Sequence, residues 1–278
     1  MIFTSYDSPQ SFGRDTLQVL LKDEVQNNLP ISFILNESNQ DTSDWILATV
    51  KDNSGQVVLT AACTPPFRMV MYETANIAND DAVQLLADEL KERNVVLSGV
   101  VAETTLARRF AEAFAGIGKY RRHLSMNIMR LDKVNPIAKA QGNIRLLQQS
   151  DLYFEPYWER AFQEECKVEV FDLQTNYQRA FDRLQADDHF IWQDEHPVAQ
   201  AYHARSTQNG AGVSGVYTPP QYRGRGYASS LVAEMSEIFL SRGYQFCFLF
   251  ADAENPISCS IYRKIGYYDL CVFEEIDF

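Results

Sequence analysis

The stretch VSGVYTPPQYRGRGYASS, residues 213–230, is the most informative part of the sequence. Its first residues favour an extended strand, and Pro219–Pro220 end that strand because neither proline can donate a backbone hydrogen bond. Gly224 and Gly226 permit backbone dihedrals that a Cβ would obstruct. Apolar residues then recur at helical spacing over 228–239. The stretch therefore predicts a strand, a glycine-containing loop and an amphipathic helix.

A glycine-containing loop that runs into a helix N-terminus suits phosphate. The first N–H groups of the helix are free there, and the helix dipole is positive at that end. Arg223 and Arg225 add formal positive charge at the same place. The spacing is not the Gly-x-Gly-x-x-Gly of a dinucleotide fold, and no Gly-Lys-Ser/Thr follows as in a P-loop. Taken alone, the loop also fits a tight connection with two solvated arginines.

Two blocks of sequence carry a resemblance to a known family. Residues 221–226, QYRGRG, resemble the Gln/Arg-x-x-Gly-x-Gly/Ala pyrophosphate loop of the GNAT superfamily of N-acetyltransferases. Residues 255–267, NPISCSIYRKIGY, are similar to the family's Asn-x-x-Ser…Tyr-x-Lys-x-Gly-Phe/Tyr segment. The blocks stand in the family's order, separated by a helix and the apolar strand 246–250. Together they predict an acyl-CoA-binding domain in the second half of the chain.

The resemblance implies direct attack of an amine on the thioester of acetyl-CoA, the co-substrate, without a covalent enzyme intermediate. It implies that backbone groups of Val216 and Thr218 pair with pantetheine, and that an N–H near Val216 polarises the acyl carbonyl. Strand 213–218 is expected to separate from strand 246–250 to leave room for that arm. The implied CoA-binding residues are Val216, Tyr217, Thr218, Arg223, Gly224, Arg225, Gly226, Tyr227, Ala228, Ser229, Asn255, Ser258 and Lys264.

The resemblance also assigns Tyr262 as the catalytic acid that protonates the departing thiolate. An ordinary phenol has a pKa of about 10, so it keeps its proton at neutral pH and can donate it. A core aromatic at 262 and a plain surface lysine at 264 are the structural alternatives, and Cys259 fits helix packing better than a nucleophile. The general base stays open. The sequence offers Glu195, His196, Glu155 and Asp252, or a chain of waters.

Length and composition limit the other possibilities. The 278 residues suffice for one large or two ordinary domains, and no apolar run is long enough to cross a membrane. The first 13 residues do not resemble a signal peptide, and the five cysteines show no Cys-x-x-Cys pairing, which favours a reducing cytoplasm. The cysteines and four histidines are dispersed, so no metal site is expected. The net charge of −12 argues against a nucleic-acid partner.

Acidic residues concentrate between Asp151 and Glu195, a segment that contains twelve acidic and four basic residues. A solvated helical surface explains such a run. If two helices of this region instead roof the acceptor site, their field favours a cationic amine.

The order of predicted elements repeats in the two halves of the chain. A helix at 10–27, a strand at 31–35, a hairpin around Asp52–Gly55, further strands at 68–73, 95–101 and 123–131, and helices after Asn79 and at 104–115 fill the first half. A linker near 132–143 precedes a comparable series ending in strands to Phe278. We therefore expect an α/β fold of two GNAT-like units, 1–134 and 141–278, each a mixed, mostly antiparallel twisted sheet flanked by helices.

The first half lacks the CoA loop. At the corresponding position, residues 75–81 have no glycine or arginine, and Asp80 and Asp81 would repel a pyrophosphate at a helix N-terminus. We interpret this half as a degenerate copy that shapes the acceptor cleft or supports the catalytic half, in preference to an independent second site.

Two classes of function follow. The first is an acetyl-CoA-dependent N-acetyltransferase acting on a small cationic amine or a peptide amine, with a longer acyl donor also open. The second is a non-catalytic acyl-CoA sensor or interaction module. Retention of Tyr262 favours the enzyme. The expected partners are acetyl-CoA and the amine, with no nucleic acid or membrane, and the chain is a monomer or homodimer.

Overall fold

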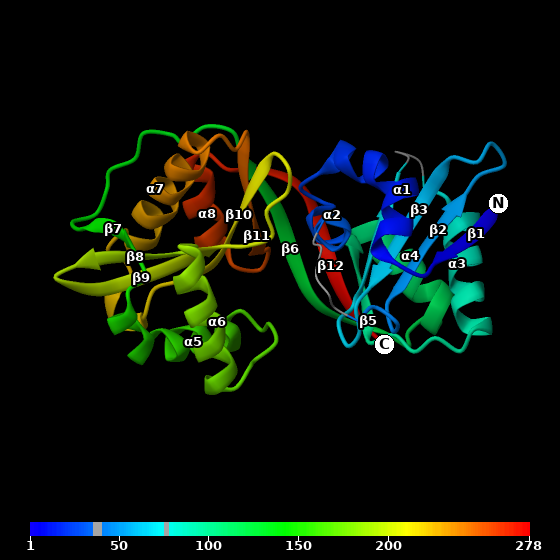
Figure 1. The fold of residues 1–278 in the computed structure, drawn as a ribbon, viewed down its shortest axis with the longest axis horizontal. Coiled ribbons are helices and arrows are strands. Elements are labelled where there is room, and N and C mark those ends of the chain that lie inside the picture. The colour runs from blue at the N-terminus through cyan, green and yellow to red at the C-terminus, as the bar shows by residue number, and fades with distance from the viewer. Residues whose placement is uncertain (36–40, 75–77) are drawn as a thin grey trace. The chain divides into compact units, whose positions relative to one another are not determined.

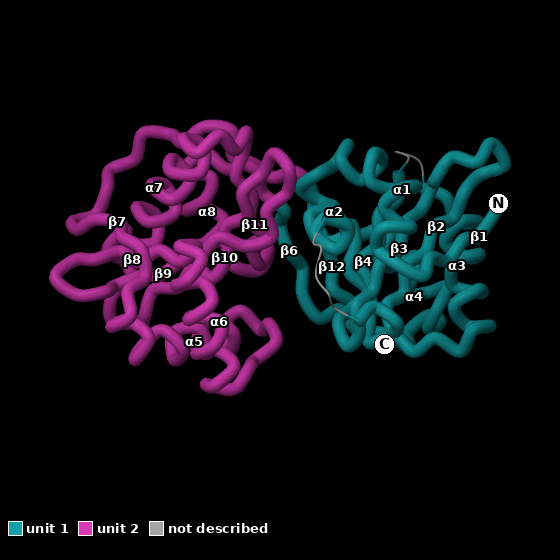
Figure 2. Tube along the Cα trace, in the orientation of Figure 1, with its two compact units in different colours: residues 1–128, 271–278 teal, residues 129–270 magenta. Residues whose placement is uncertain are grey.

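The computed structural model describes residues 1–35, 41–74 and 78–278. It divides the chain into two compact units (Figure 2). Unit 1 comprises residues 1–128 and 271–278, and unit 2 comprises residues 129–270. The domain limits predicted from the sequence are 1–134 and 141–278. The compact units divide at residues 128/129 instead, and the end of the chain, residues 271–278, lies with unit 1.

Unit 1 holds a mixed sheet with strand order β1-β2-β3-β4-β5-β12. Strands β4 and β5 pair in parallel, and the other pairs in this order are antiparallel. Its elements, most of them labelled in Figure 1, are β1 (Ile2–Tyr6), α1 (Pro9–Leu20), η1 (Leu21–Asp23), α2 (Asn28–Leu35), β2 (Ile46–Lys51), β3 (Val57–Cys63), β4 (Met69–Glu73), α3 (Asp80–Glu92), β5 (Gly99–Glu103), α4 (Thr104–Ala115), most of β6 (Arg121–Leu131) and most of β12 (Tyr268–Asp277).

Alternating residues of the unit 1 strands reach two different cores. Ala48, Leu59 and Met71 pack with α3 and α4. Their neighbours Leu47 and Tyr72 pack with α1 and α2 instead. Because successive side chains of a strand point to opposite faces, helices flank both sides of this sheet.

Unit 2 repeats the arrangement with strand order β7-β8-β9-β10-β11. Strands β10 and β11 are parallel, and the other pairs in this order are antiparallel. Its elements are β7 (Asn143–Leu146), η2 (Gln149–Tyr153), α5 (Glu155–Glu165), α6 (Leu173–Ala186), β8 (His189–Asp194), β9 (His196–His203), β10 (Gly210–Tyr217), η3 (Pro220–Tyr222), α7 (Tyr227–Ser241), β11 (Phe246–Asp252) and α8 (Pro256–Ile265). Helix α7 packs on the face that carries Phe190 and Ala201, whereas α6 packs on the opposite face with Ile191.

Each half of the chain runs as strand, two helices, three antiparallel strands, helix, strand, helix and strand, and the closing strand of the second half, β12, lies mostly in unit 1. This confirms the predicted fold class of two α/β units with mixed sheets flanked by helices. The predicted helix over 104–115 and the hairpin around Asp52–Gly55 are also present, as α4 and β2–β3.

One element was predicted wrongly. Residues 31–35 belong to helix α2, not to a strand. Five apolar residues in a row fit a buried strand or a buried helix equally well. Pro30 decides for the helix, because a proline is tolerated in the first helical turn, where its missing N–H has no partner in any case. The sequence also gave no sign of strand β1, whose alternating half-exposed residues pair with β2.

No described helix combines the length and the apolar character that a membrane crossing needs.

Candidate functional site

The loop before α7 in unit 2 has the backbone geometry of an anion site. Gly224 and Gly226 adopt left-handed φ angles of 76° and 82°, which residues with a Cβ adopt only at a cost. Gly226 is the N-cap of α7, and no side chain within the described structure caps this helix. The first N–H groups of α7 are therefore available to a ligand, at the positive end of the helix dipole.

The two arginines of the loop are placed differently. Arg223 donates from Nε to the carbonyl oxygen of Thr218 at 2.8 Å and from Nη2 to both carboxylate oxygens of Glu165 at 2.8 and 2.7 Å. Arg225 is exposed and interacts with Tyr227. Both guanidinium groups thus remain at the loop, although the α5 carboxylate already neutralises that of Arg223.

Strands β10 and β11 pair over only three residues, Gly210–Gly212 against Phe246–Phe248. The pairing ends there, although β10 continues to Tyr217, as expected for strands that separate to admit a pantetheine arm. The β10–β9 register also shifts between Ser214 and Tyr217. Beyond this irregular part, the Thr218 hydroxyl is buried and has no hydrogen-bond partner in the described structure.

Gly215 explains the irregularity of β10. Its φ angle of 61° is left-handed, and a Cβ built on it would lie 1.9 Å from the ring of Tyr202. Only glycine allows β10 to approach Tyr202 this closely. Val216, expected to polarise the acyl carbonyl, follows directly and is half-exposed.

The remaining expected residues of the loop have mixed environments. Ala228 and Ser229 lie half-exposed in the first turn of α7. Tyr217 and Tyr227 are buried, and the Tyr227 hydroxyl donates to Asp194 at 2.5 Å. One hydroxyl group that supports the loop, that of Ser230, was not predicted from the sequence. Ser230 accepts a hydrogen bond from the Ala140 N–H at 2.8 Å and donates to the carbonyl oxygen of Gly226 at 3.0 Å, which ties the loop to the preceding segment.

The second motif block forms helix α8. Asn255 is its N-cap and accepts from the Ser258 N–H at 3.2 Å, and the Ser258 hydroxyl donates back to the Asn255 carbonyl oxygen. Lys264 is exposed. Tyr262 is 9% exposed, and burial raises its pKa above the ordinary value, with smaller contributions from the nearby Cys166 and Cys259. A tyrosine in this environment stays protonated at neutral pH.

The four candidate bases do not converge on one place. Glu195 and His196 form the turn between β8 and β9, where Glu195 has a left-handed φ of 56° and both side chains are exposed. Asp252 ends β11 and accepts from the Glu254 N–H at 2.8 Å. Glu155 is fully buried in α5.

The acidic run is only partly a solvated surface. Asp151, Glu155 and Glu159 are 4%, 0% and 2% exposed, whereas Glu164, Glu165 and Glu169 are exposed. Glu155, Glu159 and Gln163 lie four residues apart on one face of α5, and this face is buried. The spacing of four residues between these polar side chains could have indicated a shared helix face, but counting the charges of the whole run did not distinguish them from the exposed acids.

The described residues of unit 1 have no comparable anion site. Helix α3 is capped by the Asn79 side chain and has Asp80 and Asp81 in its first turn. Residues 75–77 of the corresponding loop lie outside the described residues. The fold places a pocket of about 370 Å³ where β4 and β5 end, lined by Asp23, Gln26, Met71, Tyr72, Glu73, Thr74, Ala78, Glu103, Thr105, Leu106, Arg109 and Phe273.

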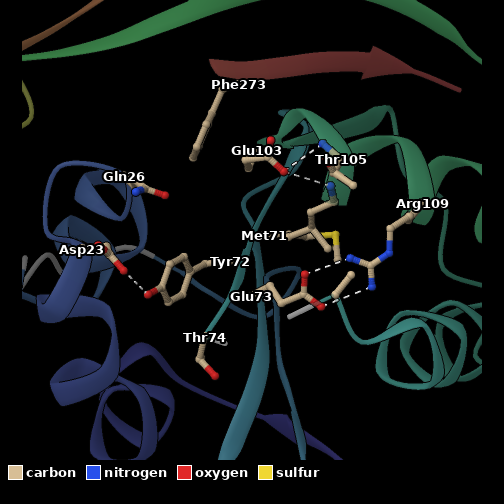
Figure 3. Close-up of a pocket in the computed structure, with 12 residues that line it drawn as sticks. Asp23, Gln26, Met71, Tyr72, Glu73, Thr74, Glu103, Thr105, Arg109 and Phe273 are labelled. Carbon is tan, nitrogen blue, oxygen red and sulfur yellow. Dashed lines mark hydrogen bonds and ion pairs between the residues drawn. The ribbon is translucent and has the colours of Figure 1, made fainter. Parts of the chain in front are cut away.

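Figure 3 shows how the polar groups of this pocket are already paired. Arg109 donates to both carboxylate oxygens of Glu73, and Tyr72 donates to Asp23. Arg109 also donates to Asp80, outside the residues drawn. Glu103 caps α4 by accepting from the N–H groups of Thr105 and Leu106. With the one arginine of the pocket paired to carboxylates, this pocket is poorly suited to a phosphate.

No group of three or more His, Cys, Asp or Glu side chains in the described residues could hold a metal ion.

Comparison with known proteins agrees with the geometry of unit 2. The family model described as the acetyltransferase (GNAT) family matches residues 152–267. Residues 152–267, which make up most of unit 2, are therefore similar to a GNAT acetyltransferase domain. GNAT enzymes use an acyl-CoA donor, which fits the uncapped helix and glycine loop at the centre of the matched range. No curated protein matches the chain by sequence.

Solved GNAT structures share the fold of the whole chain at low sequence identity. A GCN5-related N-acetyltransferase from Sphaerobacter thermophilus has a TM-score of 0.67 at 15% identity, over 99% of this chain and 94% of that one. A GNAT-family acetyltransferase from Colwellia psychrerythraea has a TM-score of 0.64 at 10% identity, over 100% and 99%. A tandem GNAT protein from the clavulanic acid biosynthesis pathway has a TM-score of 0.57 at 12% identity, over 99% and 97%. These structures cover unit 1 as well as unit 2, so unit 1 shares the GNAT-like fold.

Proposed function

We propose that the chain transfers an acetyl group from acetyl-CoA to a primary amine by direct attack, and that unit 2 carries the reaction. One observation above all supports the proposal. The uncapped N-terminus of α7 follows two left-handed glycines and has two arginines beside it. A pyrophosphate needs such a combination of free N–H groups and positive charge. Unit 1 has a side-chain cap and two acids at the equivalent helix.

The acetyl group would lie next to the irregular end of β10. The Val216 N–H would polarise its carbonyl oxygen, and the Thr218 hydroxyl, buried without a partner, would bond a pantetheine amide. Asn255 would hold the same arm through its side-chain amide. Tyr262 would donate its proton to the departing CoA thiolate, because its raised pKa keeps it protonated. We favour a small cationic or peptide amine as acceptor.

We also propose a reducing, cytoplasmic setting, since none of the five cysteines forms a disulfide in the described structure.

The test is a thiol-release assay with acetyl-CoA across amines of different charge, paired with direct binding of CoA. Gly224→Glu should abolish CoA binding, because it places a negative charge at the phosphate position. Gly243→Glu is the matched control. Its φ of 102° is also left-handed and its Cβ position is also open, but it lies past the other end of α7.

The two outcomes separate the candidate functions. Release of free CoA with at least one amine, lost in Gly224→Glu and kept in Gly243→Glu, supports the transferase. Tight CoA binding without release for any amine favours an acyl-CoA sensor instead.

A further inference from the structure

Unit 2 buries a cluster of polar and charged side chains between its sheet and the helices α5 and α6. Helix α5 contributes Glu155 and Glu159, α6 contributes Arg183, β8 contributes His189 and β9 contributes Tyr202. All five are at least partly buried, and Glu155 and His189 are 0% exposed. Burying ionisable groups is costly unless they are paired, so such a cluster requires an explanation.

The cluster is incompletely paired. Both carboxylate oxygens of Glu155, one oxygen of Glu159 and both ring nitrogens of His189 have no hydrogen-bond partner in the described structure. The closest approaches to Glu155 are 3.6 Å from Arg183 Nη1 and 3.6 Å from His189 Nδ1. Each unpaired buried polar group costs about 1–3 kcal/mol of stability. Buried polar groups that are left unpaired at such cost are candidates for a functional role.

One positive charge faces two carboxyl groups here. Arg183 Nη2 lies 3.8 Å from Glu159, and its guanidinium carbon lies 3.6 Å from the centre of the Tyr202 ring. Glu159 accepts hydrogen bonds from Tyr202 and Gln163, both at 3.1 Å, so it is the better stabilised carboxylate. Burial, and then the charge of Glu159, raise the pKa of Glu155 to about 8, against the opposing effect of Arg183. Burial and Arg183 lower the pKa of His189, which is therefore neutral.

A path of hydroxyl groups leads from this cluster to the acyl site. Tyr202 contacts Gly215, the left-handed residue of β10, and its hydroxyl bonds Glu159. Ser214 lies directly opposite Tyr202 in the pairing of β10 with β9 and is half-exposed, two residues before Val216. The cluster thus connects to the part of β10 where the acyl carbonyl is expected.

We propose that Tyr202 and the Glu155–Glu159 pair form a proton relay that takes up the proton which the acceptor ammonium must lose before attack. The inference rests on the proposed function and names the base that the sequence left open. The ammonium N–H bond breaks and its proton passes to the Tyr202 oxygen, by way of the Ser214 hydroxyl where the amine does not reach Tyr202. The Tyr202 proton moves to Glu159, and the amine lone pair becomes free for the thioester.

The charge balance explains why two carboxyl groups are needed. With both ionised, the pair carries one more negative charge than Arg183 can neutralise, and uptake of one proton removes that excess. With a single carboxylate, uptake would leave the arginine unbalanced in a buried site. The pair therefore accepts a proton as a unit.

The test compares Tyr202→Phe and Glu155→Gln with the wild type, using the best acceptor from the thiol-release screen. Both changes preserve side-chain shape, and Phe keeps the ring against Gly215. We expect kcat to fall by about 10²-fold or more in each variant, with KM for acetyl-CoA unchanged. Tyr268→Phe is the matched control, because it removes another tyrosine–carboxylate hydrogen bond in unit 2, to Asp132 at 2.8 Å.

The pH profile distinguishes a relay from a structural role. Wild-type kcat/KM should rise as pH rises through about 8, where Glu155 titrates, and this limb should vanish in Glu155→Gln. An acceptor whose own pKa lies below the assay pH needs no deprotonation, so the deficit of Tyr202→Phe should shrink toward onefold. The relay would be overturned if the pH profile of kcat/KM were the same in Glu155→Gln as in the wild type, and if Tyr202→Phe lost the same activity with both kinds of acceptor. The relay would also be overturned if Asp252→Asn, and not Tyr202→Phe or Glu155→Gln, lowered kcat and removed the pH-dependent limb.

An infrared titration separates failure of the inference from failure of the proposed function. The wild type should show a protonated carboxyl band that disappears as pH rises through about 8 and is missing in Glu155→Gln. Absence of this band overturns the relay even if acetylation is found. If no amine is acetylated, the proposed function fails and the relay, as a part of that reaction, fails with it.

Discussion

Glu165 at the end of α5 holds Arg223 of the phosphate loop through two hydrogen bonds of 2.8 and 2.7 Å. Both side chains are about half-exposed. The carboxylate occupies the guanidinium that a CoA pyrophosphate would use, so protein and ligand compete for one positive charge.

Replacing Glu165 with Gln should therefore tighten acetyl-CoA binding. Because an exposed ion pair contributes only about 0.2–1 kcal/mol, the expected decrease in Kd is about two- to fivefold. Isothermal calorimetry at low salt measures it. Glu164→Gln is the matched control, since Glu164 is similarly exposed but pairs with Arg160 within α5. Equal affinities for the two variants would show that Arg223 does not contact the pyrophosphate.

One CoA should bind per chain. Among the described helices, only α7 has an uncapped N-terminus behind a glycine loop, whereas α3 carries Asn79 as a cap and two acids. Calorimetry with excess CoA should give a stoichiometry close to one, lost in Gly224→Glu. Two sites of comparable affinity would contradict the interpretation of unit 1 as a degenerate copy.

Tyr262→Phe should lower kcat by about 10²–10⁴-fold and leave the affinity for acetyl-CoA nearly intact. The reason is the loss of a single proton donor from a buried ring whose packing Phe preserves. The effect is measured by steady-state kinetics with an acceptor whose product is released quickly, so that the chemical step limits kcat. Tyr267→Phe, which removes a hydroxyl from the same core, is the control. An unchanged kcat would mean that the thiolate, with a pKa of about 8.5, leaves unaided.

Stability should depend on pH through Glu155. Its pKa is raised from 4.5 to about 8 in the folded protein, so the folded state binds more protons than the unfolded state between these values. The contribution of Glu155 to the stability of the folded wild type is greatest below pH 4.5 and is lost as pH rises through about 8. Glu155→Gln lacks this loss, so it should gain stability relative to the wild type across the window. Denaturant unfolding at several pH values, with Glu164→Gln as control, measures the difference. Parallel curves would contradict the raised pKa.

The expected preference for a cationic acceptor is tested at the exposed acids of the acidic run. Neutralising Glu155 or Glu159 would disturb a buried cluster, so the exposed Glu164 and Glu169 are the residues to replace with Gln. KM for a cationic amine should rise by about two- to fivefold, and that for a neutral amine should not. The difference should shrink with added salt, because exposed charges are screened. Equal changes for both amines would make these acids an ordinary solvated surface.

The sequence alone determined the parts of this protein that depend on neighbouring residues. The loop 221–226 and the block 255–267 are contiguous, so their glycines, arginines and capping asparagine can be recognised from local order. The cap at Asn79 and the hairpin turn at Asp52–Gly55 are equally local, because a side chain or a turn satisfies backbone groups two to four residues away. Repetition of these local elements was enough to indicate two similar units.

The tertiary structure decided which charges are buried and where the chain end lies. Glu155 and Glu164 belong to one acidic run and one helix, but only the first faces Arg183, His189 and Tyr202, residues up to 47 positions away. Strand β12 likewise pairs with β5 across about 170 residues, which no local pattern encodes. Burial and strand pairing depend on contacts between segments that are distant in sequence. A local pattern of charged residues therefore does not reveal whether the folded protein covers those residues or leaves them in water.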